Sequence, residues 1–309
     1  MSLLLAGVQQ NDEVLVPGLT FVATANAISY CGGIPHFVDI EEDTLGINPF
    51  KLENYLSSIM EVSGGCSINK NTGRKISAIV PVHIFGHPCK IDAILEVAKK
   101  YKLEMVEDAA ESLGSFYKGK HTGTFGKLGA ISFNGNKIIT TGGGGMIITD
   151  DEELARQAKH LTTTAKVSHK WEYVHDRLGY NYRMPNLNAA LGCAQLNRLP
   201  ELLQSKRDLF GKYREQISRI DDIRLFEEPS YCSSNYWLQA TILDEANLAL
   251  RDEILAILND TGLMSRPAWT GIHKLTPFQD CPRMDMSTTD CLEKRIINLP
   301  SSSFLNDKS

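Results

Sequence analysis

The chain has 309 residues, of which 42% are hydrophobic and 22% are charged, and its formal net charge is −5. These values are typical of a globular enzyme with a sizeable core, and they give no electrostatic reason to expect nucleic acid or an anionic membrane as a partner. No apolar run approaches the roughly 18 residues that span a bilayer, and the seven cysteines form no C-x-x-C pair, which favours a cytoplasmic protein with reduced thiols and no metal site.

The first half of the chain alternates strand-like and helix-like segments. Short apolar or β-branched runs favour strands, and the segments between them have helical spacing. This alternation predicts an α/β fold with a largely parallel sheet and helices on both faces, in which ligands bind at the carboxyl ends of the strands. We expect strands at 13–16, 35–40, 75–83, 103–107, 128–133 and 146–149, and helices at 21–30, 48–60 and 91–101.

The character of the chain changes from residue 151 onward. Helical patterns at 151–161, 185–203, 205–218 and 245–259 surround a strand-like run at 236–242. We interpret this part as a smaller α+β unit, so that residues 1–200 form a large domain and residues 201–309 a small carboxy-terminal domain. The polar, glycine-containing segment 63–75 is expected to be an exposed loop.

Two segments place reactive side chains after predicted strands. Met105–Ser112 (MVEDAAES) ends a buried strand with an acidic pair, and Ser132–Thr141 (SFNGNKIITT) carries one lysine before four consecutive glycines. A Schiff-base enzyme needs a lysine near the sheet edge, a carboxylate that faces a pyridine nitrogen, hydroxyls for a phosphate and an apolar face for a ring. These four parts could come from Lys137, Asp108, Ser132 and Phe21.

Each of these residues also has an ordinary structural interpretation. A loop lysine is usually solvated, Asp108 could cap a following helix, Ser132 could bond to backbone, and Phe21 could be a core side chain. The glycine run fits either a flexible turn or a phosphate cradle. It does not match G-x-x-x-x-G-K-[ST], and no G-x-G-x-x-G opens a helix after the first strand, which disfavours a nucleotide cofactor.

At these residues the chain resembles the DegT/DnrJ/StrS aminotransferases, which have the aspartate-aminotransferase-like fold (fold type I). The resemblance runs from Leu3 to Leu305. It implies an aminotransferase with pyridoxal phosphate as its cofactor. The motifs that carry it are EVLVPGLTFVATAN (13–26), PVHIFGHP (81–88), EDAAES (107–112), SFNGNKIITTGGGG (132–145) and GYNYRM (179–184).

The resemblance also implies roles for the candidate residues. In the family, the lysine matching Lys137 forms a Schiff base with the cofactor, and the aspartate matching Asp108 pairs with the pyridine nitrogen. The serine matching Ser132 contacts the phosphate, and the aromatic residue matching Phe21 stacks on the ring. Glu111 stands where many members have Gln or His near the ring, and we expect it to bind the cofactor too.

The family assembles active sites from two subunits. The asparagine matching Asn181 reaches the cofactor phosphate from the neighbouring subunit, which implies a homodimer with shared active sites. Candidates for substrate contacts flank this motif or lie near the carboxyl terminus, and ordinary surface packing explains them equally well. They are His175, Arg183, Trp269 and His273.

The motif at 132–145, together with HLTTTAK at 160–166, is similar to the subgroup linked to legionaminic-acid-type and bacillosamine-type sugars (LegC-type). Those enzymes aminate C4 of a UDP-4-keto-6-deoxy-N-acetylhexosamine, with L-glutamate as the usual donor. The resemblance therefore implies a ping-pong amino transfer to a nucleotide sugar, with Lys137 as general acid and base. Related sugar dehydratases have histidine at the lysine position, so Lys137 disfavours that chemistry.

The amino terminus departs from the family pattern. Leu3–Gly7 is typical of the last turns of a helix and its cap, whereas family members carry several tens of residues before this point. Those residues include a loop that opens the helix and supplies N–H groups to the cofactor phosphate. The sequence therefore predicts an amino-terminally truncated member. The alternative is a catalytically impaired fragment or non-catalytic homologue that acts only as a dimer or binding module.

Overall fold

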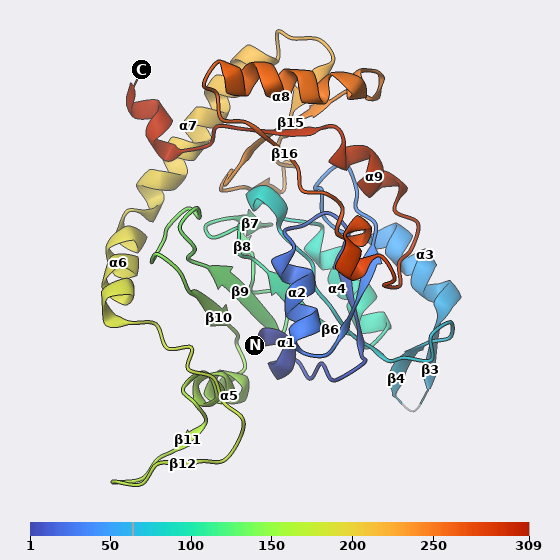
Figure 1. Ribbon diagram of the computed structural model, residues 1–309, viewed down its shortest axis with the longest axis vertical. Coiled ribbons are helices and arrows are strands. Elements are labelled where there is room, and N and C mark those ends of the chain that lie inside the picture. The colour runs from blue at the N-terminus through green and yellow to red at the C-terminus, as the bar shows by residue number, and fades with distance from the viewer. Residues whose placement is uncertain (64, 309) are drawn as a thin grey trace.

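The computed structural model describes residues 1–63 and 65–308, and a six-stranded sheet forms its centre (Figure 1). The strand order is β10-β9-β6-β5-β1-β2, and only the pair β10–β9 is antiparallel. The predicted, largely parallel α/β sheet is confirmed. Its strands are β1 (Glu13–Pro17), β2 (Ile34–Val38), β5 (Ile76–Ile79), β6 (Glu104–Asp108), β9 (Leu128–Ser132) and β10 (Gly145–Ile148).

Helices cover both faces of this sheet, and the alternation of side chains along β1 shows why. Leu15 enters one core with α3 (Pro49–Ile59) and α4 (Ile91–Lys100). Val14 and Val16 point to the opposite face and enter a second core. That core includes side chains of α1 (Ser2–Leu5), α2 (Ala23–Tyr30) and α5 (Glu152–Thr162).

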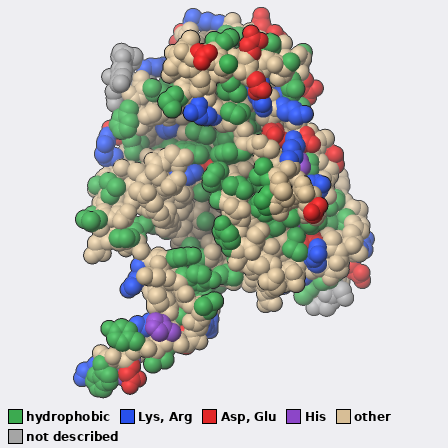
Figure 2. Space-filling model, in the orientation of Figure 1, with side chains coloured by type: hydrophobic (Ala, Val, Ile, Leu, Met, Phe, Trp, Pro, Cys, Tyr) green, Lys and Arg blue, Asp and Glu red, His purple; other side chains and the backbone are tan. Residues whose placement is uncertain are grey.

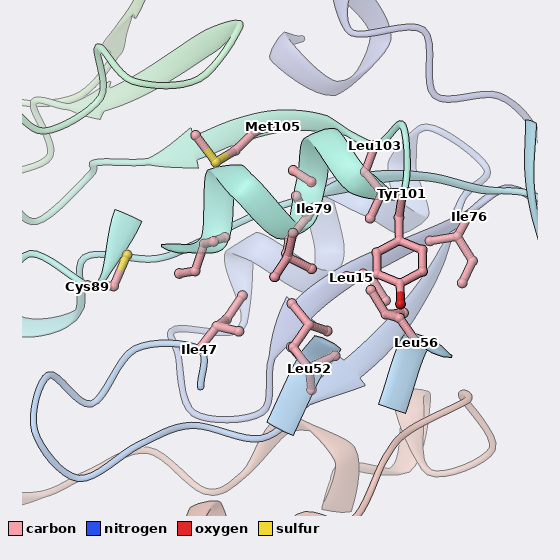
Figure 3. Close-up of a cluster of buried hydrophobic side chains, with 14 of the residues drawn as sticks. Leu15, Ile47, Leu52, Leu56, Ile76, Ile79, Cys89, Tyr101, Leu103 and Met105 are labelled. Carbon is pink, nitrogen blue, oxygen red and sulfur yellow. The ribbon is translucent and has the colours of Figure 1, made fainter. Parts of the chain in front are cut away.

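The first core shows how the helices are held (Figure 3). Leu52 and Leu56, one turn apart on α3, are fully buried against Ile79 and Leu15. Each such side chain stabilises the fold by roughly 1.5–3 kcal/mol. The helix starts where it does because the Asn48 side chain accepts the N–H groups of residues 50 and 51, with proline at the first helical position.

The segment predicted to be a loop over 63–75 is partly a hairpin. β3 (Met60–Ser63) pairs with β4 (Cys66–Asn69), so that prediction was wrong for its first part; residue 64 lies outside the described residues. Asn69 Nδ2 and Thr72 Oγ1 donate to the buried carboxylate of Glu13, at 2.8 and 2.6 Å. The polar composition of the segment therefore reflects a buried carboxylate that needs donors, as well as exposure to solvent.

The helices predicted over 185–203 and 205–218 are divided at a different place: α6 spans Asn186–Asn197, and α7 runs without a break over Leu199–Ile217. They meet at Arg198, which ends one helix and precedes the other. Pro200, in the first turn of α7, has no N–H to continue α6 and disfavours helical backbone before it. The predicted domain boundary at 200/201 falls in this turn, and the division into two domains stays a prediction.

The carboxy-terminal third contains a four-stranded antiparallel sheet in the order β13-β15-β17-β16. The helix predicted over 245–259 is a 3-10 segment, Glu245–Leu250, followed by α8 (Arg251–Asp260), which lies across the top of Figure 1. A further helix, α9 (Ser287–Glu293), precedes the last strand. The strands are β13 (Ile223–Leu225), β15 (Gln239–Leu243), β16 (Arg266–Pro267) and β17 (Ile296–Leu299).

Residues 163–185 form an arm between α5 and α6 that projects from the body of the molecule (Figure 1). Within it, β11 (Lys166–Val167) pairs with β12 (Val174–His175).

No helix in the described part of the chain is long and apolar enough to cross a membrane. One more small sheet consists of β7 (Phe116–Tyr117), β8 (Lys120–His121) and β14 (Cys232–Ser233).

Candidate active site

The two motifs singled out from the sequence meet because β6 and β9 are parallel neighbours. Their register pairs Asp108 with Ala130, so Asp108 and Ser132 both lie at the carboxyl ends of the sheet. The close approach beside this edge requires glycine at 129, because a Cβ there would lie 2.1 Å from the carbonyl oxygen of Gly123. The pairing of β6 with β9 thus brings the two motifs together, and this part of β9 has no room for a side chain at residue 129.

A cavity of about 330 Å³ opens at these strand ends. Its wall combines side chains of both motifs with residues of the α2 segment and of the carboxy-terminal third. Six of the residues predicted to bind cofactor or substrate line it, and Thr24 and Trp237 are among the lining residues that were not predicted. The six are Phe21, Asp108, Glu111, Ser132, Lys137 and Trp269.

Asp108 is held in one orientation by two hydrogen bonds. The hydroxyl of Thr24 donates to Oδ2 at 2.7 Å, and the backbone N–H of Ala110 donates to Oδ1 at 3.1 Å. No helix follows Asp108 within the described residues around it, so the alternative role as a helix cap does not apply. The carboxylate is a fixed wall of the cavity.

Glu111 is buried beside the lysine. The backbone N–H of Phe85 donates to its Oε2 at 2.8 Å, and its Oε1 lies 3.5 Å from Lys137 Nζ. Burial raises the pKa of Glu111 to about 7, because the loss of water outweighs the attraction of the neighbouring lysine. A carboxyl with this pKa can take up or release a proton near neutral pH.

Lys137 is not a solvated loop lysine. Its side chain is 13% exposed, and Nζ lies 3.8 Å from the centre of the Trp237 ring as well as beside Glu111. The predicted lysine therefore points into the cavity. Thr24 lies within the motif at 13–26 and could have been found from it, whereas no spacing rule links Trp237 to a lysine one hundred residues earlier.

Phe21 and Ser132 also lie on the cavity rather than in the core. Phe21 is 50% exposed, and its ring centre is 5.8 Å from that of Trp269. Ser132 Oγ accepts the N–H of Asn134 at 3.2 Å, so its own O–H remains a donor for a bound group. Together they present an aromatic face and a hydroxyl to the same space.

The other predicted residues do not line this cavity in the described part of the chain. His175 and Asn181 are exposed on the arm, and Arg183 Nε donates to Asn181 Oδ1 at 3.3 Å. His273 is buried, with Nε2 3.0 Å from Asp290 Oδ1. Their roles at an active site therefore stay predictions.

Comparison with known proteins shows which family the chain belongs to. The sequence model of the DegT/DnrJ/EryC1/StrS aminotransferase family matches residues 1–309. The chain belongs to this family. The expectation of an aminotransferase of fold type I is thereby confirmed, and the lysine, aspartate and aromatic face described above lie in the cavity of a DegT/DnrJ/EryC1/StrS protein.

Individual members of the family align over nearly the whole chain. EpsN of Bacillus subtilis (strain 168), whose name describes a pyridoxal phosphate-dependent aminotransferase, is 36% identical over 99% of this chain and 77% of its own length. GDP-perosamine synthase of Escherichia coli O157:H7 is 35% identical over 100% of this chain and 79% of its own. The sugar aminotransferase Spr1654 of Streptococcus pneumoniae superimposes with a TM-score of 0.88 at 26% identity, over 99% and 81%.

The cofactor of this DegT/DnrJ/EryC1/StrS aminotransferase is pyridoxal phosphate, which the name of EpsN and the PLP-form of Spr1654 both give. The cavity fits this group by its side chains: an amine at Lys137, a fixed carboxylate at Asp108, a hydroxyl at Ser132 and a half-exposed ring at Phe21. Among the residues that line the cavity, only Lys137 carries an amine.

Proposed function

We propose that this aminotransferase moves an amino group from L-glutamate to a nucleotide-linked 4-keto-6-deoxy sugar, with UDP-4-keto-6-deoxy-N-acetylhexosamine as the first candidate. The observation that supports it is the meeting of Lys137, Asp108 and Glu111 in one cavity with an aromatic wall. The LegC-type subgroup assignment belongs to this proposal, as does its place in the cytoplasm.

In this proposal, the position of each cavity residue determines its role. Pyridoxal phosphate, when bound, supplies an aldehyde and an electron-withdrawing ring. Asp108, held by Thr24 and Ala110, lies ready to keep a pyridine nitrogen protonated. Lys137 would hold the cofactor's aldehyde through Nζ and would serve as the general acid and base that moves a proton between the substrate carbon and the cofactor. Glu111, 3.5 Å away, is placed to exchange a proton with that amine.

Phe21 is expected to face the cofactor ring, and the neighbouring ring of Trp269 favours a ring-shaped acceptor. Phe21 and Trp269 lie with their ring centres 5.8 Å apart, and Trp269 lies 5.3 Å from Phe85. Sugar rings have apolar C–H faces that pack on aromatic side chains, while the keto group needs the polar end of the cavity at Lys137. A GDP-linked keto sugar is the second candidate, because a relative at 35% identity is a GDP-perosamine synthase.

A second copy of the chain is part of the proposal. α6 has no buried residues although it carries Leu187, 86% exposed, with Leu191 and Leu196 also exposed. The arm adds exposed Trp171 and Tyr173, and Figure 2 shows hydrophobic side chains along this side of the molecule. A dimer that buries this surface would bring Asn181, His175 and Arg183 to the partner's cavity.

The test of the chemistry starts with the lysine. Purified protein is incubated with pyridoxal phosphate and reduced with borohydride, and the modified peptide is identified by mass spectrometry. We expect the cofactor mass on Lys137 and none in Lys137→Ala. Glutamate with each of a panel of UDP-, GDP- and TDP-linked 4-keto sugars should then release more than one equivalent of 2-oxoglutarate per bound cofactor with one sugar class only. Protein that binds no cofactor would support the non-catalytic alternative instead.

The test of the dimer uses two inactive variants. Lys137→Ala lacks the amine and Asn181→Ala lacks the residue expected to act in the partner's site. If sites are shared, a mixture of the two, exchanged and reassembled, regains activity that neither has alone, because one site of the hybrid is intact. No regain in a mixture shown to form hybrids would contradict shared sites.

A further inference from the structure

Trp237 lies on the wall of the cavity although it comes from the carboxy-terminal third of the chain. Its ring centre is 3.8 Å from Lys137 Nζ, and the residue is 5% exposed. Glu111 Oε1 lies 3.5 Å from the same amine. The lysine amine is therefore in contact with both a ring face and a carboxyl.

Three hydrogen bonds fix the position of Trp237. The indole Nε1–H donates to the carbonyl of Asn136 at 2.7 Å, directly before Lys137 in the chain. The backbone N–H donates to Asn235 Oδ1 at 2.8 Å, and the backbone carbonyl accepts from Lys206 Nζ at 2.9 Å. Since all its polar groups are bonded, the ring has little freedom to leave the lysine.

Asn235 ties the same segment to the loop that carries Glu111. Its Nδ2 donates to the carbonyls of Glu111 and Leu113, at 2.8 and 3.0 Å. Gly86 makes room for it, because a Cβ at that position would lie 1.9 Å from Asn235 Oδ1. Residues 235–237 thus hold both neighbours of the Lys137 amine in fixed relation to each other.

The interaction has a direct physical basis. The face of an indole attracts a lysine ammonium more strongly than the face of tyrosine or phenylalanine, and the attraction grows when water is excluded. A lysine side chain has several rotatable bonds and loses substantial freedom when it is held. A buried ring over the amine selects the few rotamers that keep Nζ in the cavity.

We propose that Trp237 is a positioning residue whose ring holds the amine of Lys137 in the cavity, beside Glu111, whenever that amine is not bonded to the cofactor. Its consequence for catalysis rests on the proposed function. A transfer cycle would require the lysine amine to detach from the cofactor and to re-attach. By restricting the rotamers of Lys137, the ring would keep Nζ close to the point of re-attachment. The contact between ring and amine can be tested in cofactor-free protein.

The first experiment uses cofactor-free protein. Limited acetylation with acetic anhydride is followed by mass spectrometry, and labelling of Lys137 is compared with that of exposed Lys99 in the same sample. Trp237→Leu should raise the ratio by about tenfold, within a range of roughly 3 to 30 that corresponds to loss of a buried cation–π contact. Trp237→Phe keeps an aromatic ring that attracts the ammonium less strongly, so it should raise the labelling ratio by a smaller amount.

An unchanged ratio in Trp237→Leu would overturn the proposal, and so would a Phe variant that behaves like the Leu variant. Circular dichroism and thermal unfolding show whether each variant folds; if the Leu variant does not, the intermediate ratio of the Phe variant decides. In the loaded enzyme we expect kcat to fall in Trp237→Leu while KM for the donor changes little. If the Lys137-to-Lys99 labelling ratio rises as expected in the variants but no amino group is transferred to any sugar, the proposed function is refuted and this inference still holds.

Discussion

Glu111 provides the sharpest test of the electrostatics of this cavity. Its carboxyl is 6% exposed, its Oε2 accepts one backbone N–H, and burial raises its pKa to about 7 in the folded protein. In the unfolded chain the same group titrates near 4.5. We therefore consider Glu111→Gln, which keeps the size and the ability to accept the N–H of Phe85 but cannot ionise.

The direction in which the free energy of unfolding changes with pH follows from proton binding to Glu111. Between pH 4.5 and about 7 the folded protein holds a proton on Glu111 that the unfolded chain has released, so the free energy of unfolding falls as the pH rises through this window. The difference between the two pKa values corresponds to about 3 kcal/mol, at about 1.4 kcal/mol per pH unit. Glu111→Gln lacks this loss, so its stability relative to the native chain should increase by about that amount from pH 4.5 to 8.

The assay is chemical denaturation of cofactor-free protein at pH 5, 6, 7 and 8, with both chains measured in the same buffers. Glu53→Gln serves as the matched control, since Glu53 is a surface glutamate in an exposed pair with Lys100. This control shows how much of the effect comes from a Glu-to-Gln change as such. A stability difference between Glu111→Gln and the native chain that stays constant from pH 5 to 8 would refute the reasoning, because it would mean that Glu111 titrates alike in both states.

Substitutions at three further positions, with matched controls, test other contacts. Thr24→Val removes the 2.7 Å bond to Asp108 and should weaken pyridoxal phosphate binding about 10- to 100-fold in a spectroscopic titration; Thr24→Ser should retain most of the affinity. Burial lowers the pKa of Lys206 to about 8. Between pH 8 and 10.5 the free energy of unfolding of the native chain should therefore rise relative to that of Lys206→Met, by up to about 3 kcal/mol. Parallel plots of unfolding free energy against pH for the two chains would contradict this. Gly129→Ala should destabilise by about 1–3 kcal/mol or more, whereas Gly211→Ala, with open space around it on α7, should stabilise slightly in the same denaturation assay.

The part of the site that could be predicted from the sequence is the part that strand order fixes. Asp108 and Ser132 follow buried strands, and parallel neighbours end at the same edge, so their meeting needs no knowledge of side-chain packing. Trp237 reaches Lys137 only because residues 235–237 bond to two loops far away in sequence. The break at Arg198 had a local signal in Pro200, which the helical periodicity around it concealed.

The hairpin at 60–69 was missed for a different reason. Its polar residues are typical of a loop, yet two residues of this region, Asn69 and Thr72, donate to a carboxylate that lies wholly inside the protein. Composition reports how polar a segment is and does not report where its partners are. The same limit applies to Asn181, whose expected partner would belong to a second chain.

The two walls of the cavity depend on different parts of the chain. Asp108 is held by Thr24 and Ala110, both in the first half. Lys137 is enclosed by Glu111 from the first half and by Trp237 from the carboxy-terminal third, where Lys206 on α7 holds the Trp237 carbonyl. A substitution that loosens α7 or the segment before β15 should therefore disturb the contacts of Lys137, whereas the two hydrogen bonds of Asp108 come from the first half of the chain.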